Sequence, residues 1–147
     1  MTFKSKIDLP FSIMIFLSIA VIALAGVLPF LLGEILSFST IILLLIVIIP
    51  TILLLILITF NTRYIFYDDY LQAKSVFFGS KIPYRDIYKV HPTGNFISGY
   101  RIMTSKDGIE IHSRSIGFGS VKISPENKDL FTEELKKRAP HADYVEI

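Results

Sequence analysis

The sequence predicts an α+β, mainly β protein: an N-terminal two-helix transmembrane hairpin followed by a seven-stranded antiparallel barrel with a C-terminal helix. Three observations predict this fold class. Two long uncharged apolar runs fill most of the first 60 positions, short segments separated by turn residues follow, and the chain ends in an amphipathic helical pattern. We therefore divide the chain into a membrane hairpin, residues 1–60, and a β domain, residues 61–147.

The first apolar run, about residues 11–32, contains no charged side chain. A cleaved signal peptide is the alternative to a membrane span, because Lys4 and Lys6 form a basic start and Ala23-Leu24-Ala25 looks like a cleavage site. Apolar character continues to Leu32, well beyond the roughly 7–15 residues of a signal peptide's apolar core. We therefore favour a span that stays in the protein.

The second apolar run, residues 41–60, is the clearest membrane-spanning pattern in the chain. It has no ionisable side chain, and all of its residues except Pro50, Thr51 and Thr59 are Leu, Ile, Val or Phe. Twenty helical residues extend over roughly 30 Å, the thickness of the hydrocarbon core of a bilayer. The sequence therefore predicts a two-pass membrane protein.

The basic residues predict which side of the membrane holds the chain ends. Lys4 and Lys6 precede the first span, Arg63 and Lys74 follow the second, and the connection at residues 33–40 has neither Lys nor Arg. Basic residues near membrane spans are enriched on the cytosolic side. We expect both termini in the cytosol and the protein in the cytoplasmic membrane.

The β domain is predicted from short segments with alternating polarity, separated by turn residues such as Asp68-Asp69 and Gly79-Ser80. The best-defined hairpin has its corner at Lys106-Asp107-Gly108, because Asp-Gly suits a type I′ turn. We predict seven strands at residues 63–67, 70–78, 81–83, 87–92, 100–105, 109–114 and 120–123.

A C-terminal helix is predicted after the last strand. Ser124 can cap it with Pro125 at its first position, and Pro140 marks its end. Its apolar stripe consists of Leu130, Phe131 and Leu135. Seven strands closed by one such helix is the layout of a pleckstrin-homology-like (PH-like) barrel.

Three segments also carry a family resemblance: TRYIFYDDYL at residues 62–71, KIPYRDIYKVHPTGN at 81–95 and ISPENKDLFTEELKKRAP at 123–140. Through them the chain resembles the YyaB-like bacterial PH-domain proteins, small membrane proteins with N-terminal spans and a cytosolic PH-like domain. The resemblance implies a fold and a location, and no catalytic role for these segments. The family often has Asp-Arg before its penultimate strand where this chain reads Asp107-Gly108, so a contact of that arginine cannot be carried over.

Composition excludes several function classes. The β domain holds 13 Lys plus Arg and 11 Asp plus Glu, because Lys4, Lys6, Asp8 and Glu34 lie outside it. This balance lacks the basic excess of a nucleic-acid-binding domain, so we predict no nucleic-acid partner. The chain has no cysteine, which excludes disulfides and thiolate chemistry.

No catalytic or metal-binding motif is evident. The three histidines, His91, His112 and His141, lack metal-ligand spacing, and we read each as an isolated surface or packing residue. Asp68-Asp69 is read as a turn, because neighbouring strand residues point to opposite faces. We predict no metal, no cofactor and no enzymatic activity.

Six aromatic residues near the start of the β domain have two readings. Their alternation suits the core of a small β domain, which we favour, and a lipid-facing aromatic belt is the alternative. The six are Tyr64, Tyr67, Tyr70, Phe77, Phe78 and Tyr84.

One anion-binding site is predicted. If Asp107-Gly108 forms a two-residue loop, Arg101 lies opposite Arg114, with Lys122 on the next strand nearby. Two facing guanidinium groups are unfavourable unless solvent separates them or an anion such as a phosphate bridges them. A lipid headgroup is the natural ligand for such a site; the alternative, which we favour, is that both arginines extend into water or pair with Glu110.

These observations lead to two functional hypotheses. The first is a non-enzymatic, membrane-tethered PH-like domain that binds a protein or an anionic lipid headgroup at the cytoplasmic face, where tethering raises the effective concentration of such partners. The second is an envelope-stress or bacteriocin-immunity factor in which the membrane hairpin does the work. The sequence leaves the oligomeric state open.

Overall fold

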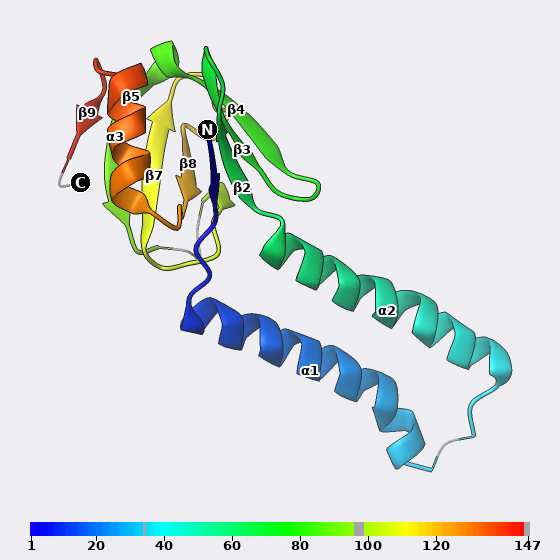
Figure 1. Cartoon of the computed structure of the whole chain (residues 1–147). Helices are drawn as coiled ribbons and strands as arrows, with labels where there is room; N and C mark the ends of the chain where they lie inside the picture. The colour runs from blue at the N-terminus through cyan, green and yellow to red at the C-terminus, as the bar shows by residue number, and fades with distance from the viewer. Residues whose placement is uncertain (34, 96–98, 146–147) are drawn as a thin grey trace.

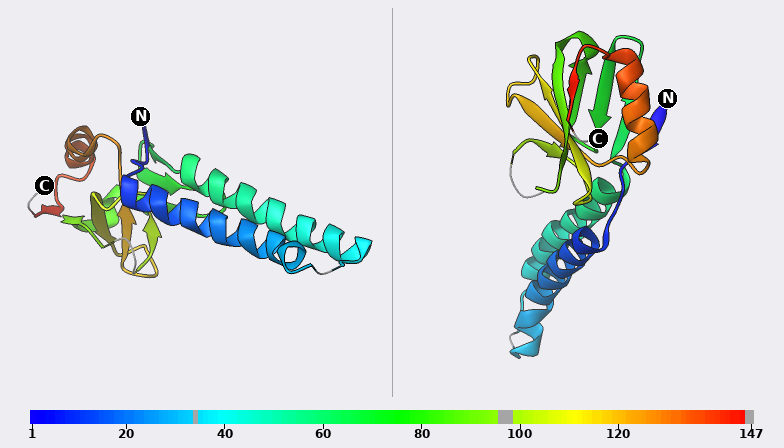
Figure 2. Two further views of the ribbon diagram at one scale, coloured as in Figure 1. Left: turned by 90° about the horizontal axis from the view of Figure 1, so that it is seen from below. Right: turned by 90° about the vertical axis from the view of Figure 1, so that its left-hand side faces the viewer.

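The computed structural model describes residues 1–33, 35–95 and 99–145. Two helices, α1 (Leu9–Leu31) and α2 (Phe38–Phe60), lie side by side as an antiparallel pair and project from a β domain (Figure 1). The views of Figure 2 show the same elongated arrangement. The protein thus has a rod-like apolar part and a separate β part with its own core.

Both predicted spans are helical, and both helices are long and apolar enough to cross a membrane. Each begins two or three residues earlier than predicted because a polar side chain caps it. Asp8 accepts a hydrogen bond from the backbone N–H of Phe11, and Ser37 accepts one from Thr40. Across Leu9–Leu31 no residue is buried, and α2 buries only Thr59, so the two helices expose large apolar side chains along their whole length. Exposed apolar surface of this extent is typical of a membrane or protein contact.

The first sheet is antiparallel, with the order β1-β2-β3-β4. Its strands are β1 (Thr2–Lys4), β2 (Arg63–Phe66), β3 (Tyr70–Lys74) and β4 (Gly79–Pro83). β1 differs from the prediction, which places residues 1–60 in the membrane hairpin: Phe3 pairs with Tyr64 and is buried in the domain core. The chain therefore enters the β domain before it forms the helices.

The second sheet has the order β6-β8-β7-β5-β9. Its strands are β5 (Ile87–Thr93), β6 (Arg101–Ile102), β7 (Gly108–Ser113), β8 (Ser120–Ile123) and β9 (Asp143–Tyr144), and a short 3-10 turn, η1 (Tyr84–Asp86), precedes β5. All seven predicted strands are present, together with β1 and β9. The strands are divided between two sheets, rather than running round one continuous seven-stranded barrel.

The predicted hairpin at Asp107-Gly108 is wrong. β6 pairs in parallel with β8, and β7 pairs with β5 and β8. Gly108 begins β7 and is not among the glycines with a positive φ angle. The N-terminal segment explains the difference, because it supplies hydrogen bonds to the chain just before β7: the hydroxyl of Thr104 donates to the carbonyl of Lys6 at 2.7 Å, and the backbone N–H of Lys106 donates to Asp8 Oδ2.

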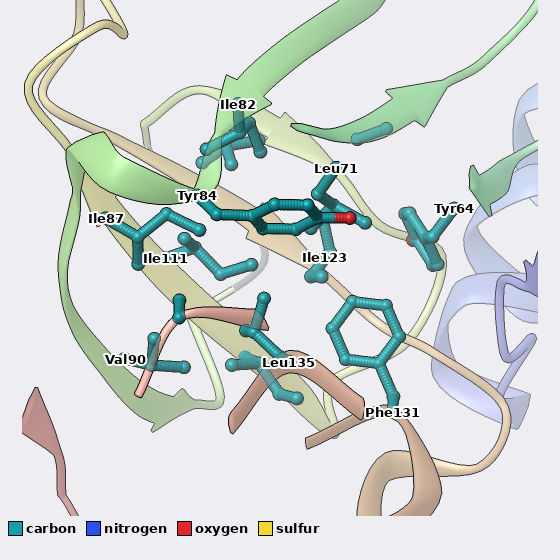
Figure 3. Packing of buried hydrophobic residues seen from close by; sticks show 14 of the residues in the cluster. Tyr64, Leu71, Ile82, Tyr84, Ile87, Val90, Ile111, Ile123, Phe131 and Leu135 are labelled. Carbon is teal, nitrogen blue, oxygen red and sulfur yellow. The ribbon is translucent and has the colours of Figure 1, made fainter. Parts of the chain in front are cut away.

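The helix α3 (Lys128–Arg138) packs over the core, as predicted. It begins after Asn127, whose side chain accepts from the N–H of Leu130, so the predicted cap at Ser124 is wrong. Phe131 and Leu135 are fully buried, whereas Leu130 faces outward. The ring of Phe131 meets the rings of Phe3, Tyr64 and Phe66, and Figure 3 shows Phe131 and Leu135 among the side chains of both sheets.

Candidate functional site

The outer face of the second sheet carries a group of polar side chains. Cross-strand pairing places Lys122 opposite Glu110 and Glu110 opposite His91. The neighbouring row places Ser120 opposite His112. Successive strand residues point to opposite faces, and the residues between these polar positions are buried in the core: Val90, Ile109, Ile111, Val121 and Ile123. The polar side chains therefore share the face turned away from the core.

Two histidines and one glutamate meet at the centre of this face. The Nε2 atoms of His91 and His112 lie 3.0 Å apart. Glu110 turns one carboxylate oxygen toward each of them: Oε2 is 3.9 Å from His91 Nε2, and Oε1 is 3.8 Å from His112 Nε2. All three side chains are half-buried, and that of Glu110 is only 14% exposed. We call these three residues the His91–Glu110–His112 cluster.

The hydrogen bonds around the cluster define its protonation. His91 Nδ1 lies 3.0 Å from the carbonyl oxygen of Pro92. Because a carbonyl can only accept, Nδ1 carries the hydrogen, and in the neutral imidazole Nε2 then has its lone pair free. Burial lowers the pKa of His112 despite the attraction of Glu110, which favours a neutral ring there as well. The hydrogen bond to Pro92 thus leaves Nε2 of a neutral His91 ring as an acceptor, facing His112 and Glu110.

Two further side chains contact the same carboxylate oxygens of Glu110 that face the histidines. The hydroxyl of Ser120 donates to its Oε1 at 2.6 Å. The Nζ of Lys122 lies 3.9 Å from its Oε2, and Lys122 is itself buried. These contacts hold the carboxylate in place beside the histidines.

The prediction that the histidines are isolated is wrong for His91 and His112. They lie 21 residues apart in the sequence, and only the pairing of β5 with β7 brings them together. One signal was available: Glu110 and His112 stand two positions apart in a predicted strand and so share a face. The partner strand is what this signal lacks, because the Asp107-Gly108 pair favours pairing of residues 109–114 with 100–105 over pairing with residues 87–92.

The predicted anion site is only partly assembled. Arg101 lies opposite Lys122 in the parallel β6–β8 pair, so these two residues are neighbours. Arg114 lies in the turn after β7, where its backbone N–H donates to the carbonyl of Asp86. The facing pair of arginines is therefore wrong, because β6 and β7 are not hydrogen-bonded neighbours. Anion binding by Arg101 and Lys122 stays a prediction.

A second candidate surface is the turn between β3 and β4, residues 75–78. Phe77 and Phe78 are 75% and 60% exposed there. The core interpretation of the early aromatic residues therefore holds for the buried Tyr64 and Tyr84 and is wrong for Phe77, Phe78 and the exposed Tyr67. The hydroxyl of Thr62, two residues beyond the end of α2, donates to that of Ser75 at 3.2 Å, and both residues are buried. We call Val76, Phe77 and Phe78 the aromatic tip.

The aromatic tip lies beside the end of α2 that enters the domain. Figure 1 shows the β3–β4 hairpin on the side of the domain from which the helices leave. Two exposed basic residues lie next to the aromatic tip: Lys74 directly precedes the turn, and Arg63 pairs with Lys74. An exposed aromatic pair next to basic residues is a pattern found at membrane interfaces.

Comparison with known proteins agrees with this architecture. Residues 62–139 match the model of the family described as "Bacterial PH domain". The chain is similar to the uncharacterized protein YyaB of Bacillus subtilis (strain 168), with 28% identity over 138 residues that cover 94% of this chain and 92% of that protein. No solved structure matches the chain. The matched residues run from the end of α2 to the end of α3 and make up more than half of the sequence, so the chain belongs to the bacterial PH domain family.

Proposed function

We propose that this protein is a non-enzymatic PH-like module, anchored by its two helices in the cytoplasmic membrane, that binds the lipid surface beside its own anchor. The observation that carries the proposal is the exposed aromatic tip, held next to the end of α2 by the contact of Ser75 with Thr62. A side chain at that position meets the bilayer as soon as the helices are inserted.

The first step of the proposal is the orientation of the anchor. The basic residues nearest to the helices, Lys4, Lys6, Arg63 and Lys74, all lie at the domain end of the hairpin. The positive-inside rule therefore favours a cytosolic domain and cytosolic chain ends.

The orientation is tested with single cysteines, because the natural chain has none. We expect the Ile35→Cys variant, in the connection between the helices, to react with a membrane-impermeant maleimide added to intact cells. The His141→Cys variant should react only after the cells are opened. The proposal would be contradicted if His141→Cys reacted in intact cells and Ile35→Cys only in opened cells. Reaction of both variants in intact cells would also contradict it, because the β domain would then lie outside the cell.

The second step is the lipid contact itself. Phe77 and Phe78 offer apolar rings that suit the boundary between headgroups and acyl chains, while Arg63 and Lys74 suit anionic headgroups. Each Lys or Arg near an anionic membrane surface contributes about 1 kcal/mol to the free energy of membrane binding. Tethering keeps the aromatic tip close to lipid at all times, so a weak contact suffices for high occupancy.

The lipid contact is tested with tryptophan, since the natural chain contains none. In proteoliposomes that contain anionic lipid, the Phe77→Trp variant should show a blue-shifted emission that lipids brominated on their acyl chains quench. Phe118→Trp is the matched control, because Phe118 is 79% exposed but lies between β7 and β8, at the end of the domain away from the helices (Figure 1). Its emission should stay water-like and unquenched.

Equal emission and equal quenching at the two positions would overturn the lipid contact. A blue shift of the Phe77→Trp variant that brominated lipid leaves unquenched would also contradict it, and would indicate a protein partner at the aromatic tip instead.

A further inference from the structure

The His91–Glu110–His112 cluster has the dimensions of a metal site. Zinc bonds to histidine nitrogen at about 2.0–2.1 Å and to carboxylate oxygen at about 2.0–2.2 Å, so two ligands of a tetrahedral ion lie about 3.3 Å apart. Here the two nitrogens are 3.0 Å apart, and each is within 3.9 Å of a Glu110 oxygen. Small rotations of the side chains would bring all three ligand atoms to bonding distance.

The hydrogen-bond pattern also leaves one of the two imidazole nitrogens free to bind a metal. The hydrogen bond from His91 Nδ1 to the carbonyl of Pro92 leaves Nε2 free as a ligand, and this outer contact is the one that metal-binding histidines usually make. In the ion-free cluster one Nε2–H donates to the other Nε2. When a metal ion binds between the two rings, that hydrogen leaves Nε2 of His112 for Nδ1 of the same ring or for water, and Ser120 keeps Glu110 in place.

We propose that His91, Glu110 and His112 form a binding site for a divalent transition-metal ion of the zinc type. Two imidazoles and one carboxylate are a ligand set that zinc uses often, and three protein ligands leave a coordination position for water. The ion joins β5 to β7 through side chains. This proposal is independent of the proposed lipid contact, because the aromatic tip lies on β3–β4 in the first sheet.

Lys122 lowers the affinity of the site for a metal ion. Its ammonium group lies 3.9 Å from Glu110 Oε2 and competes with a bound cation for that oxygen. A site of this kind releases its ion more readily than one without a neighbouring charge. The Lys122→Met variant, which keeps the chain length and removes the charge, should therefore bind zinc more tightly than the natural chain.

The proposal is tested on the full chain, purified in detergent and stripped with a chelator. Titration calorimetry with ZnCl₂ should give one ion per chain, and CoCl₂ should give the visible absorption of a tetrahedral Co²⁺ complex. The His91→Ala and His112→Ala variants should each weaken zinc binding by more than about tenfold, since outer contacts alone contribute about 10–100-fold. Glu110→Gln should also weaken it.

His141→Ala is the matched control, because His141 is the remaining histidine and lies on the surface between α3 and β9. Zinc binding should be unchanged in it. Thermal unfolding provides a second measurement: zinc should raise the melting temperature of the natural chain and of His141→Ala, and leave that of His91→Ala unchanged. Binding of less than one ion per chain, or equal affinity of the His91→Ala and His141→Ala variants, would overturn the proposal.

Discussion

Asp8 Oδ2 accepts a hydrogen bond from the backbone N–H of Lys106 at 2.5 Å, across 98 residues of sequence. The same carboxylate caps α1 through the N–H of Phe11 and accepts from the hydroxyl of Ser105. One side chain thus ends the N-terminal segment, starts the first helix and holds the chain before β7. It links the orientation of the helix pair to the β domain.

Replacing Asp8 should weaken this link. We expect the Asp8→Ala variant to lose about 0.5–2 kcal/mol of stability, the usual cost of losing a helix cap. Thermal unfolding of the full chain in detergent micelles, followed by circular dichroism, measures the loss. Asp68→Ala is the control, because Asp68 is exposed in the β2–β3 turn, and it should change stability by less than about 0.5 kcal/mol. Equal effects of the two variants would contradict the role of Asp8.

The same residue should make stability depend on pH. Burial acts to raise the pKa of Asp8, but the hydrogen bonds from Lys106, Phe11 and Ser105 outweigh it and hold the pKa below its usual value. A lowered pKa in the folded state stabilises the fold above the unfolded value, about 3.9, and this contribution is lost as the pH falls through the folded value. Between pH 5 and pH 3 the melting temperature should therefore fall more steeply for the natural chain than for Asp8→Asn. The hydrogen bond with Lys6 lowers the pKa of Asp107 as well. Asp107 is present in both the natural chain and Asp8→Asn, so its contribution cancels in the comparison. If the melting temperatures of the two proteins fell in parallel with pH, Asp8 would not be the source of the pH dependence.

The hydrogen bonds of the buried Tyr64 hydroxyl should contribute strongly to the free energy of unfolding. It donates to the carbonyl of Ile102 at 2.5 Å, accepts from the N–H of Ser124 at 3.0 Å and lies 2.8 Å from the Ser5 hydroxyl. Tyr64→Phe leaves these buried groups unsatisfied, so we expect a loss of about 1–3 kcal/mol in the same unfolding experiment. Tyr88→Phe, at an exposed position, serves as the comparison and should be nearly neutral. A neutral Tyr64→Phe variant would show that the network contributes little.

Gly26 should set the closest approach of the two helices. A Cβ atom at this position would collide with Cδ1 of Ile48, the flexible end of a side chain on α2. Gly26→Ala should therefore be tolerated through a movement of Ile48, whereas Gly26→Leu should destabilise the helix pair by about 1–3 kcal/mol through overpacking. Unfolding of the helix pair in mixed micelles gives the measurement.

Ile48→Ala should rescue the Gly26→Leu variant, because it removes the atoms that collide. Val21→Leu, at an exposed position of α1, should have little effect. An unrescued Gly26→Leu variant would indicate that its effect does not come from the contact with Ile48.

The candidate zinc site shows which features a local sequence pattern predicts and which it does not. That β5 and β7 are strands, and that Glu110 and His112 share a face, follows from alternation along each strand. Which strand lies beside β7 does not follow, because several pairings satisfy the same alternation equally well. The Asp107-Gly108 pair favoured a local hairpin, and contacts from Ser5, Lys6 and Asp8, about 100 residues away, prevail over that preference.

The amino-acid sequence by itself determined the two apolar helices, the seven strands of the β domain, the C-terminal helix and the resemblance to bacterial PH-domain proteins. These properties depend on hydrophobic periodicity and turn residues, which act over a few neighbouring positions. Only the tertiary structure decided that residues 2–4 complete the first sheet, that His91 meets His112, and that Phe77 and Phe78 remain exposed beside α2. These features depend on strand order and register, which are set by which segments bury the shared core together and not by the pattern within any one segment.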